Sequence, residues 1–236
     1  PSRITDNRIL LAGDPGYVTR LNLVGGKQLV QAWLEGDWNA IEGAFFDEWS
    51  EKRHVVEPFD IPQDWLKFRS ADWGSARPFS VGWWAVASDS RGAIPRGALV
   101  RYREWYGCVP SQPNIGLKLT ADVVGAGIAE REEGETITYG VLDPAAFAED
   151  GGPSIGERIN KKLKGGWFRG ADNKRVSQRG AMGGWDAMRQ RLAGQDATPM
   201  LFVFSSCKAF IRTVPLLQHD LDHPEDLDTE AEDHVA

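Results

Sequence analysis

The sequence has few cysteines and no long apolar run. Its 236 residues include two cysteines, Cys108 and Cys207, which stand 99 positions apart and form neither a CxxC pair nor a zinc-ligand pattern. This spacing argues against a structural zinc site, and a reducing, cytosolic setting is a simpler interpretation than a disulfide. No stretch reaches the roughly 20 apolar residues of a membrane span, and no basic-then-apolar leader is present. We therefore expect neither a membrane segment nor a secretion signal.

A nucleotide-binding P-loop is missing as well. Residues 25–27 read GGK, but position 21 is not glycine, and Gln28 stands where the motif needs Ser or Thr. The motif needs both residue types to hold the nucleotide phosphates and Mg²⁺. We therefore expect that this chain does not bind and hydrolyse ATP by itself.

Negative charge is abundant but uneven. The formal net charge is −7, and residues 220–236 contain eight Asp or Glu and no Lys or Arg. Without those eight negative charges, the rest of the chain has a net charge of +1. Residues 151–192 contain ten Lys or Arg and three Asp or Glu. A basic patch of this kind can dock phosphate groups, although an ordinary solvated surface explains it equally well.

The order of periodic segments predicts an α/β fold. Residues 1–50 form a separate first segment, with a turn signal at 13–16 and short helical periodicity at 28–34. Three β-rich runs with short connections then predict an antiparallel meander, and Ser154 with Glu157 predicts a capping box. The expected strands are 66–72, 79–87, 98–106, 136–142 and 199–205, and the expected helices are 115–131, 154–163, 180–192 and 207–217. Together they describe a mixed sheet flanked by helices.

Two aspartates follow directly on expected strands. Asp72 ends the first run, and Asp143 comes directly after the strand at 136–142. Functional groups gather at strand ends in an open α/β sheet, so neighbouring strands would hold these two carboxylates close together. Like charges at such a distance need a cation such as Mg²⁺ or Mn²⁺. Two such ions about 4 Å apart catalyse phosphodiester hydrolysis. The simpler alternative is that each Asp only caps a turn, which suits Asp143 before Pro144.

A third ligand is expected from a helix packed beside the sheet. Residues 230–234 offer Asp233 and His234 at their far end, against the alternative of a solvated acidic tail. His219 and His223 have the i, i+4 spacing of a helical metal pair, but Pro224 and the acids between them make that helix doubtful. We assign that histidine pair no role.

Short motifs along the whole chain resemble the C-terminal nuclease half of the large terminase of tailed phages, the DNA-packaging motor subunit. Residues 4–7 (ITDN) and 10–11 (LL) are similar to the end of its ATPase region, and 36–38 (GDW) and 43–49 (GAFFDEW) to the linker. Residues 70–74 (SADWG) and 141–145 (VLDPA), the latter followed by GGPSI, resemble the first two catalytic strands. Residues 173–175 (NKR) and 184–189 (GWDAMR) resemble the next loop and helix, and 232–236 (EDHVA) the start of the last catalytic motif.

The resemblance implies an RNase H-like fold, a mixed β-sheet with helices on both faces, and an endonuclease that cuts concatemeric viral double-stranded DNA during packaging. Residues 1–50 then belong to the linker and tail of the ATPase region, and 51–236 to the nuclease domain. By this analogy Asp72, Asp143, Asp233 and His234 are the catalytic and metal-binding residues, with Mg²⁺ or Mn²⁺ as cofactor, two ions in all. His234 serves as ligand or proton carrier. The chain departs from the whole protein in lacking the Walker motifs and in stopping inside the last motif.

The resemblance also implies partners and a location. These are the ATPase half of the same polypeptide, the small terminase subunit and the capsid portal, in the host cytoplasm and with no membrane.

Trp83, Trp84 and Trp105 lie in strand runs and are expected in the core rather than stacked on bases. The residues expected to hold DNA backbones are Lys161, Lys162, Lys164, Arg169, Lys174, Arg175 and Arg179.

Two other functions fit the same residues. A different RNase H-like nuclease, such as a junction resolvase, would prefer branched over linear duplexes. A non-catalytic module would bind DNA or the portal through a vestigial metal site.

Overall fold

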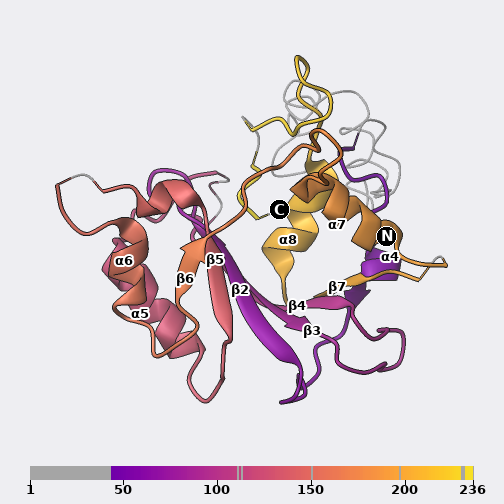
Figure 1. Cartoon of the computed structure of the whole chain (residues 1–236), viewed down its shortest axis with the longest axis horizontal. Coiled ribbons are helices and arrows are strands. Elements are labelled where there is room, and N and C mark those ends of the chain that lie inside the picture. The colour runs from indigo at the N-terminus through magenta and orange to yellow at the C-terminus, as the bar shows by residue number, and fades with distance from the viewer. Residues whose placement is uncertain are drawn as a thin grey trace, which may run out of the picture.

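A seven-stranded sheet forms the centre of the protein (Figure 1). The computed structural model describes residues 44–235 except positions 111, 113, 150, 197, 230 and 231. The turn expected at 13–16, the helix at 28–34 and the motifs at 4–7, 10–11 and 36–38 therefore lie outside the described residues. The strand order is β1-β7-β4-β3-β2-β5-β6.

Three consecutive strands build the middle of the sheet and confirm the expected meander. They are β2 (Leu66–Asp72), β3 (Ser80–Val86) and β4 (Leu99–Tyr106), and each neighbouring pair is antiparallel. The remaining strands pair in parallel on either side: β5 (Tyr139–Leu142) on β2, β6 (Phe168–Gly170) on β5, β7 (Leu201–Phe204) on β4, and β1 (Val55–Val56) on β7. The sheet is mixed, as predicted.

The predicted helix at 115–131 is wrong over its first six residues. Helix α5 is Ala121–Arg131, because the chain before it pairs with loops: the amide of Gly116 donates to the carbonyl of Ala76, and that of Leu117 to the carbonyl of Gly107. Lys118 has a φ of 56°, which an α-helix does not accommodate. The apolar residues at 115 and 117 belong to this loop and not to the helix.

The later helices are shorter than predicted. The capping box of Ser154 and Glu157 is confirmed at the start of α6 (Ile155–Asn160). Helix α7 is Gly184–Ala193, since Gly180 with a φ of 81° belongs to a turn. Helix α8 is Lys208–Thr213, and a 3-10 turn η3 (Val214–Leu216) follows, where Pro215 lacks the amide that an α-helix needs. The strands β1 and β6 and the short helix α4 (Glu51–His54) were not predicted.

Different elements cover the two faces of the sheet, and this confirms the expected helices on both faces. On what we call the α5 face, the C-terminal end of α5 lies over β2, β3 and β4, and α5 packs on α6. On the opposite face, the α8 face, the ring of Phe210 from α8 packs against Trp84 at a centroid distance of 6.2 Å. In Figure 1, α5 and α6 stand together beyond β6, and α8 stands at the other side of β2. No helix among the described residues is long and apolar enough to cross a membrane.

The tryptophans of the strands belong to the core, as expected. Trp83 is fully buried, and Trp84 and Trp105 are partly buried and packed against the core cluster. Phe45, Phe46 and Trp49 are also buried in this cluster, so the residues just before position 50 pack on the same core as the sheet.

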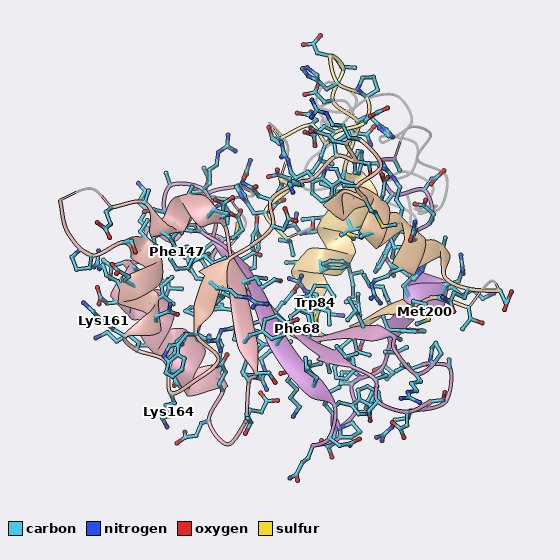
Figure 2. The ribbon with its side chains drawn as sticks, viewed as in Figure 1. Phe68, Trp84, Phe147, Lys161, Lys164 and Met200 are labelled. Atoms are coloured by element: carbon cyan, nitrogen blue, oxygen red, sulfur yellow. The ribbon has the colours of Figure 1, made fainter. Side chains whose placement is uncertain are left out.

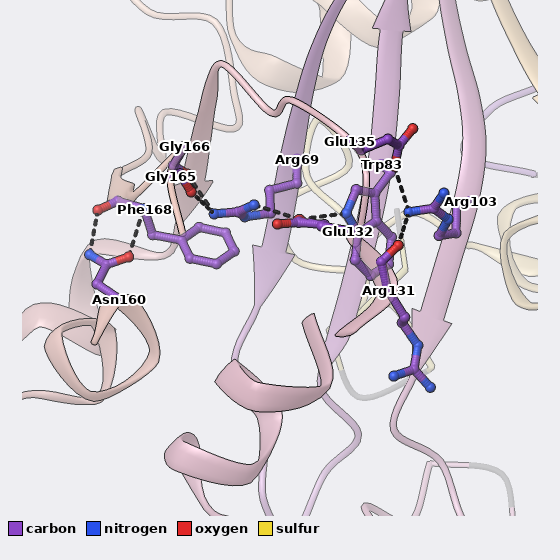
Figure 3. A network of polar contacts seen from close by, with 10 residues as sticks. All are labelled: Arg69, Trp83, Arg103, Arg131, Glu132, Glu135, Asn160, Gly165, Gly166 and Phe168. Atoms are coloured by element: carbon purple, nitrogen blue, oxygen red, sulfur yellow. Dashed lines mark hydrogen bonds and ion pairs between the residues drawn. The ribbon is translucent and has the colours of Figure 1, made fainter. Parts of the chain in front are cut away.

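A buried ion pair joins β2 to the elements of the α5 face (Figure 3). Arg69 is fully buried, and its Nη1 lies 2.5 Å from Oε1 of Glu132, just beyond α5. Its Nη2 donates to the carbonyls of Gly165 and Gly166, at 3.2 and 2.6 Å. The same Glu132 oxygen accepts the indole N–H of Trp83 at 2.7 Å. The pair of Arg69 and Glu132 thus links β2, β3, the end of α5 and the segment that leads into β6.

Removing one partner of this pair is expected to be costly. Arg69→Met leaves the Glu132 carboxylate with only the Trp83 donor, so we expect a loss of roughly 3–5 kcal/mol in the free energy of unfolding. The double variant Arg69→Met/Glu132→Gln carries no unpaired charge and should lose less than the single variant does. Urea unfolding measures both. A double variant as unstable as the single one contradicts the view that the unpaired charge dominates.

A buried histidine connects α4 to α7. The Nε2 atom of His54 donates to the carbonyl of Leu192 at 2.9 Å, and its Nδ1 lies 2.8 Å from the carbonyl oxygen and 3.0 Å from the amide nitrogen of Ser50. Burial lowers the pKa of His54 below its ordinary value of 6.5, against the opposing effect of the contacts with the carbonyls of Leu192 and Ser50. The neutral imidazole is therefore the form that the fold prefers.

This preference makes a pH-dependent contribution to stability. The contribution is fully present above pH 6.5, and it declines as the pH falls from 6.5 toward the lower pKa of the folded state, because the unfolded chain then binds more protons. His54→Gln should be less stable than the wild type at pH 8, and the difference should shrink at pH 5. Thermal unfolding across this range checks it. A difference that grows toward low pH contradicts the assignment.

Candidate active site

Asp72 and Asp143 stand at the same end of two adjacent parallel strands. The register of β2 and β5 pairs Ala71 with Leu142, so the two aspartates occupy the next level of the ladder. Side chains alternate along a strand, and Asp72 and Asp143 each follow by two positions a residue of the α8 face, Ser70 and Val141. The register therefore places both acids at the same end of two adjacent strands, while a shared metal between them stays a prediction.

The carboxylate of Asp143 is engaged locally. Its Oδ1 accepts the amide of Ala145 at 2.6 Å and caps the 3-10 turn η2 (Pro144–Phe147). This is the turn-capping role that the sequence left open as the simpler alternative. The role uses one oxygen of the carboxylate, and it does not conflict with a second function for the same group.

The C-terminal segment brings two more functional groups to Asp72. Nδ1 of His234 lies 2.8 Å from Oδ2 of Asp72, and the same nitrogen lies 3.8 Å from Oδ1 of Asp233. In Figure 1 the C-terminus lies beside α8, near the ends of β2 and β5. A contact across 162 positions of sequence thus joins Asp72, Asp233 and His234 in one cluster.

The charges in this cluster shift the pKa values of its members. The hydrogen bond to Asp72, together with the charges of Asp72 and Asp233, raises the pKa of His234 above its ordinary value despite partial burial. Burial and the charge of Asp72 raise the pKa of the Asp233 carboxyl. Arg77 and Arg175 lie close enough to oppose these shifts. Carboxylates, arginines and an imidazole with a raised pKa thus act on one another at this end of the sheet.

A clamp holds the C-terminal segment in place. Glu232 accepts the hydroxyl of Tyr106 at 2.7 Å and both terminal nitrogens of Arg212 at 2.6 and 2.7 Å. These hydrogen bonds lower the pKa of Glu232, although burial alone would raise it. The guanidinium of Arg101, fully buried, donates to the carbonyl of Val235 at 3.2 Å. We call Tyr106, Arg212 and Glu232 the Glu232 clamp.

The Glu232 clamp was not predicted, and one expectation about this segment is wrong. Residues 232–235 are not helical, because the segment is anchored through side chains on the sheet and α8 rather than through its own backbone. The sequence contains no local signal for this, since Tyr106 and Glu232 are 126 positions apart.

The donor chemistry of the site fits a hard divalent cation. Asp72, Asp143 and Asp233 supply carboxylate oxygens and His234 an imidazole, the ligand types that Mg²⁺ and Mn²⁺ accept. Within the described ranges, however, no three Asp, Glu, His or Cys side chains are gathered as a metal site. Asp143 is turned to the amide of Ala145, whereas Asp72 contacts His234 directly.

The basic residues expected to hold DNA fall into two groups. Figure 2 shows Lys161 and Lys164 at the α6 side of the molecule, apart from Phe68 and Trp84, and Lys162 lies 4.0 Å from Asp122. The other four lie on β6 or on the exposed segment between β6 and α7: Arg169, Lys174, Arg175 and Arg179. In this second group, Arg175 bonds to Asp226 at 2.9 Å and is near Asp233.

The fold resembles that of a phage large terminase. The large terminase of the thermophilic bacteriophage D6E superposes with a TM-score of 0.57 at 17% identity in its complex with ADP, over 81% of this chain and 42% of the terminase. A further crystal form also gives 0.57, over 81% and 41%. This chain therefore spans about two fifths of that protein. The mixed sheet with its helices is the RNase H-like fold that the sequence resemblance implied.

Nuclease domains of two other large terminases align less closely. That of P22 matches with a TM-score of 0.49 at 14% identity, over 79% of this chain and 84% of that domain. That of the thermophilic phage G20c, a structure with bound cobalt, matches with 0.46 at 8% identity, over 78% and 87%. No protein-family model and no curated protein matches the sequence.

The Glu232 clamp should control the order of the last residues. Arg212→Met removes the bidentate partner of Glu232, so we expect faster hydrogen exchange at the amides of residues 233–235, with little change in the melting temperature. Arg96→Met, an exposed residue between β3 and β4, serves as the matched control. Mass spectrometry of the C-terminal peptide provides the measurement, and unchanged exchange in Arg212→Met contradicts the clamp.

Proposed function

We propose that this chain is the nuclease domain of a phage DNA-packaging terminase, a Mg²⁺- or Mn²⁺-dependent endonuclease that cuts concatemeric double-stranded DNA. The observation that carries the proposal is the meeting of Asp72 with Asp233 and His234 at the strand end where Asp143 also stands. Three carboxylates, which are hard oxygen donors, and one imidazole at the ends of adjacent strands suit phosphodiester hydrolysis, and the likeness of the fold to the D6E large terminase supports the assignment.

The metal ligands in this proposal are Asp72, Asp143, Asp233 and His234. Bound Mg²⁺ or Mn²⁺, two ions in all, would supply an activated water and neutralise the charge that develops on the phosphate. The negative potential of the three carboxylates attracts these cations and would repel an unescorted phosphate. For this reason the carboxylates alone cannot serve as the substrate site.

For His234 the proposal keeps two alternative roles, metal ligand or proton carrier. As a proton carrier, the imidazole would donate through Nδ1 to Asp72 across 2.8 Å and would give the proton on Nε2 to a leaving oxygen. In that case the buried carboxylate of Asp233 stabilises the protonated ring. The Glu232 clamp sets the position of both residues and is a positioning device in this scheme.

Duplex DNA is the substrate in this proposal, held through its backbone by basic residues. Arg169, Lys174, Arg175 and Arg179 follow β5 and β6 on the route from the sheet to α7, whereas Lys161, Lys162 and Lys164 belong to the side of α6. The partners that we propose are the ATPase half of the same polypeptide, the small terminase subunit and the capsid portal. The site of action is the portal in the host cytoplasm.

One observation favours a second candidate, a non-catalytic docking module. In the described residues no three ligands are gathered for a metal. Calorimetric titration with Mn²⁺ separates the two candidates. Heat that is lost in Asp72→Ala supports the nuclease, and intact DNA binding without any heat from Mn²⁺ supports the docking module.

Substitution of the strand-end acids tests the nuclease. In Mn²⁺, Asp72→Ala and Asp143→Ala should each cut plasmid DNA about a hundredfold more slowly or worse, because each removes a ligand from the reacting centre. Asp60→Ala, an exposed acid between β1 and β2, serves as the control and should retain wild-type cutting. Full activity in both strand-end variants shows that the site is wrong.

A further inference from the structure

A row of aromatic rings crosses the α8 face of the sheet. The register places Tyr139 of β5 beside Phe68 of β2, and Phe68 beside Trp84 of β3. The rings of Phe68 and Tyr139 have centroids 5.1 Å apart and planes 8° apart, and those of Phe68 and Trp84 lie at 6.3 Å and 10°. Figure 2 shows Phe68 and Trp84 next to each other at the middle of the sheet.

The two ends of this row differ in their cover. At the β3 end, Trp84 packs against Phe210 of α8 and the buried guanidinium of Arg101. Toward β6 the cover ends: Phe68 and Tyr139 are only half-buried. Trp167 is 64% exposed, and its carbonyl accepts the amide of Gly140. Trp167 comes directly before β6, so its backbone bond to β5 places this exposed residue at the uncovered end of the row.

A cation borders the uncovered end. Arg169 of β6 lies with its guanidinium carbon 5.0 Å from the centre of the Tyr139 ring, and it is exposed. Arg169 pairs in register with Val141, two positions before Asp143. We call Phe68, Tyr139, Trp167 and Arg169 the ring strip.

The ring strip and the acidic cluster lie in line on one face. Phe68 and Asp72 are on the same strand and the same face, four residues apart, which is about 13 Å at the rise of a β-strand. The rise of a DNA duplex is about 3.4 Å per base pair, so the same distance corresponds to roughly four base pairs. A duplex with a phosphate at Asp72 can therefore extend over the ring strip.

We propose that the ring strip binds the backbone of duplex DNA on one side of the cut. Arg169 contacts a phosphate, and the apolar rings contact the adjoining deoxyribose. The rings of Phe68 and Tyr139 face each other and thus offer edges rather than faces to a ligand, which suits sugar contacts and not base stacking. The inference rests on the proposed function for the position of the cut, but DNA binding can be measured without any cutting.

Charge favours DNA over a protein partner at this surface. The exposed guanidinium of Arg169 lies on the same face as Asp72, whose acidic cluster binds metal ions in the proposed function. DNA is a polyanion, so it can contact Arg169 directly and the acidic cluster through such metal ions. A contact made of one phosphate and several sugars carries no base sequence information. The ring strip should therefore raise affinity for all duplexes alike.

The test is binding of a labelled duplex in EDTA, followed by fluorescence anisotropy over a range of salt concentrations. Arg169→Gln should weaken binding and lower the slope of log K against log salt by about 0.9, the value for one phosphate contact. The double variant Trp167→Leu/Tyr139→Leu should weaken binding several-fold with an unchanged slope. Arg96→Gln is the charge-matched control, and circular dichroism and melting temperature establish that every variant is folded.

Each outcome decides the proposal. Wild-type affinity in both ring-strip variants overturns it, and so does absence of duplex binding by the wild-type chain. Preference for single-stranded DNA that depends on Trp167 and Tyr139 overturns the sugar contact in favour of base stacking. Unchanged DNA affinity with lost binding to the ATPase half shows a protein docking surface instead and also overturns it. If the predicted changes in binding occur while Mn²⁺ supports no cutting, the ring strip stands and the proposed nuclease falls.

Discussion

The buried pair of Arg69 and Glu132 is the constraint on which the rest of the sheet depends. A guanidinium fully removed from water costs free energy unless its donors are paired. Burial lowers the pKa of Arg69 and the carboxylate of Glu132 opposes this, while two backbone carbonyls and the ring of Phe168 complete the surroundings. These partners come from α5 and from the segment before β6. The position of β2, and of Asp72 three residues further on, therefore depends on elements up to 97 positions away.

The same strand serves two purposes because its side chains alternate. Its odd-numbered residues, Lys67 and Arg69, are neutralised by acids of the α5 face. Its even-numbered residues face α8 and the C-terminal segment, where Asp72 meets His234 rather than an arginine. The charges of Lys67 and Arg69 on the α5 face are thus paired with carboxylates, whereas Asp72 on the α8 face is paired with an imidazole. A one-residue slip of β2 would exchange the two sets, so the register decides which acids remain available to a ligand.

Local sequence patterns predicted the parts of the fold that are built from local interactions. The alternation in β2, β3 and β4 and the capping box of Ser154 depend on neighbours only. The start of α5 was wrong because Gly116 and Lys118 bond to residues 75 and 76, at least 40 positions earlier, and β6 was missed because three residues carry too little pattern. The Glu232 clamp depends on Tyr106, at a separation that no local pattern reports. The strand-end acids followed from strand order, whereas His234 beside Asp72 matched only an expectation from family resemblance.

The arrangement of the acids follows from the electrostatics of the chain itself. Carboxylates at adjacent strand ends repel one another, and each takes up the nearest donor: Asp143 the amide of Ala145, Asp72 the imidazole of His234. Asp233 is partly buried, and burial, together with the charge of Asp72, raises its pKa against the opposing charges of His234 and Arg175. The Glu232 clamp, through Tyr106 and Arg212, holds the segment that carries Asp233 and His234 beside Asp72. The charges at this end of β2 therefore depend on residues of β4, α8 and the C-terminal segment together.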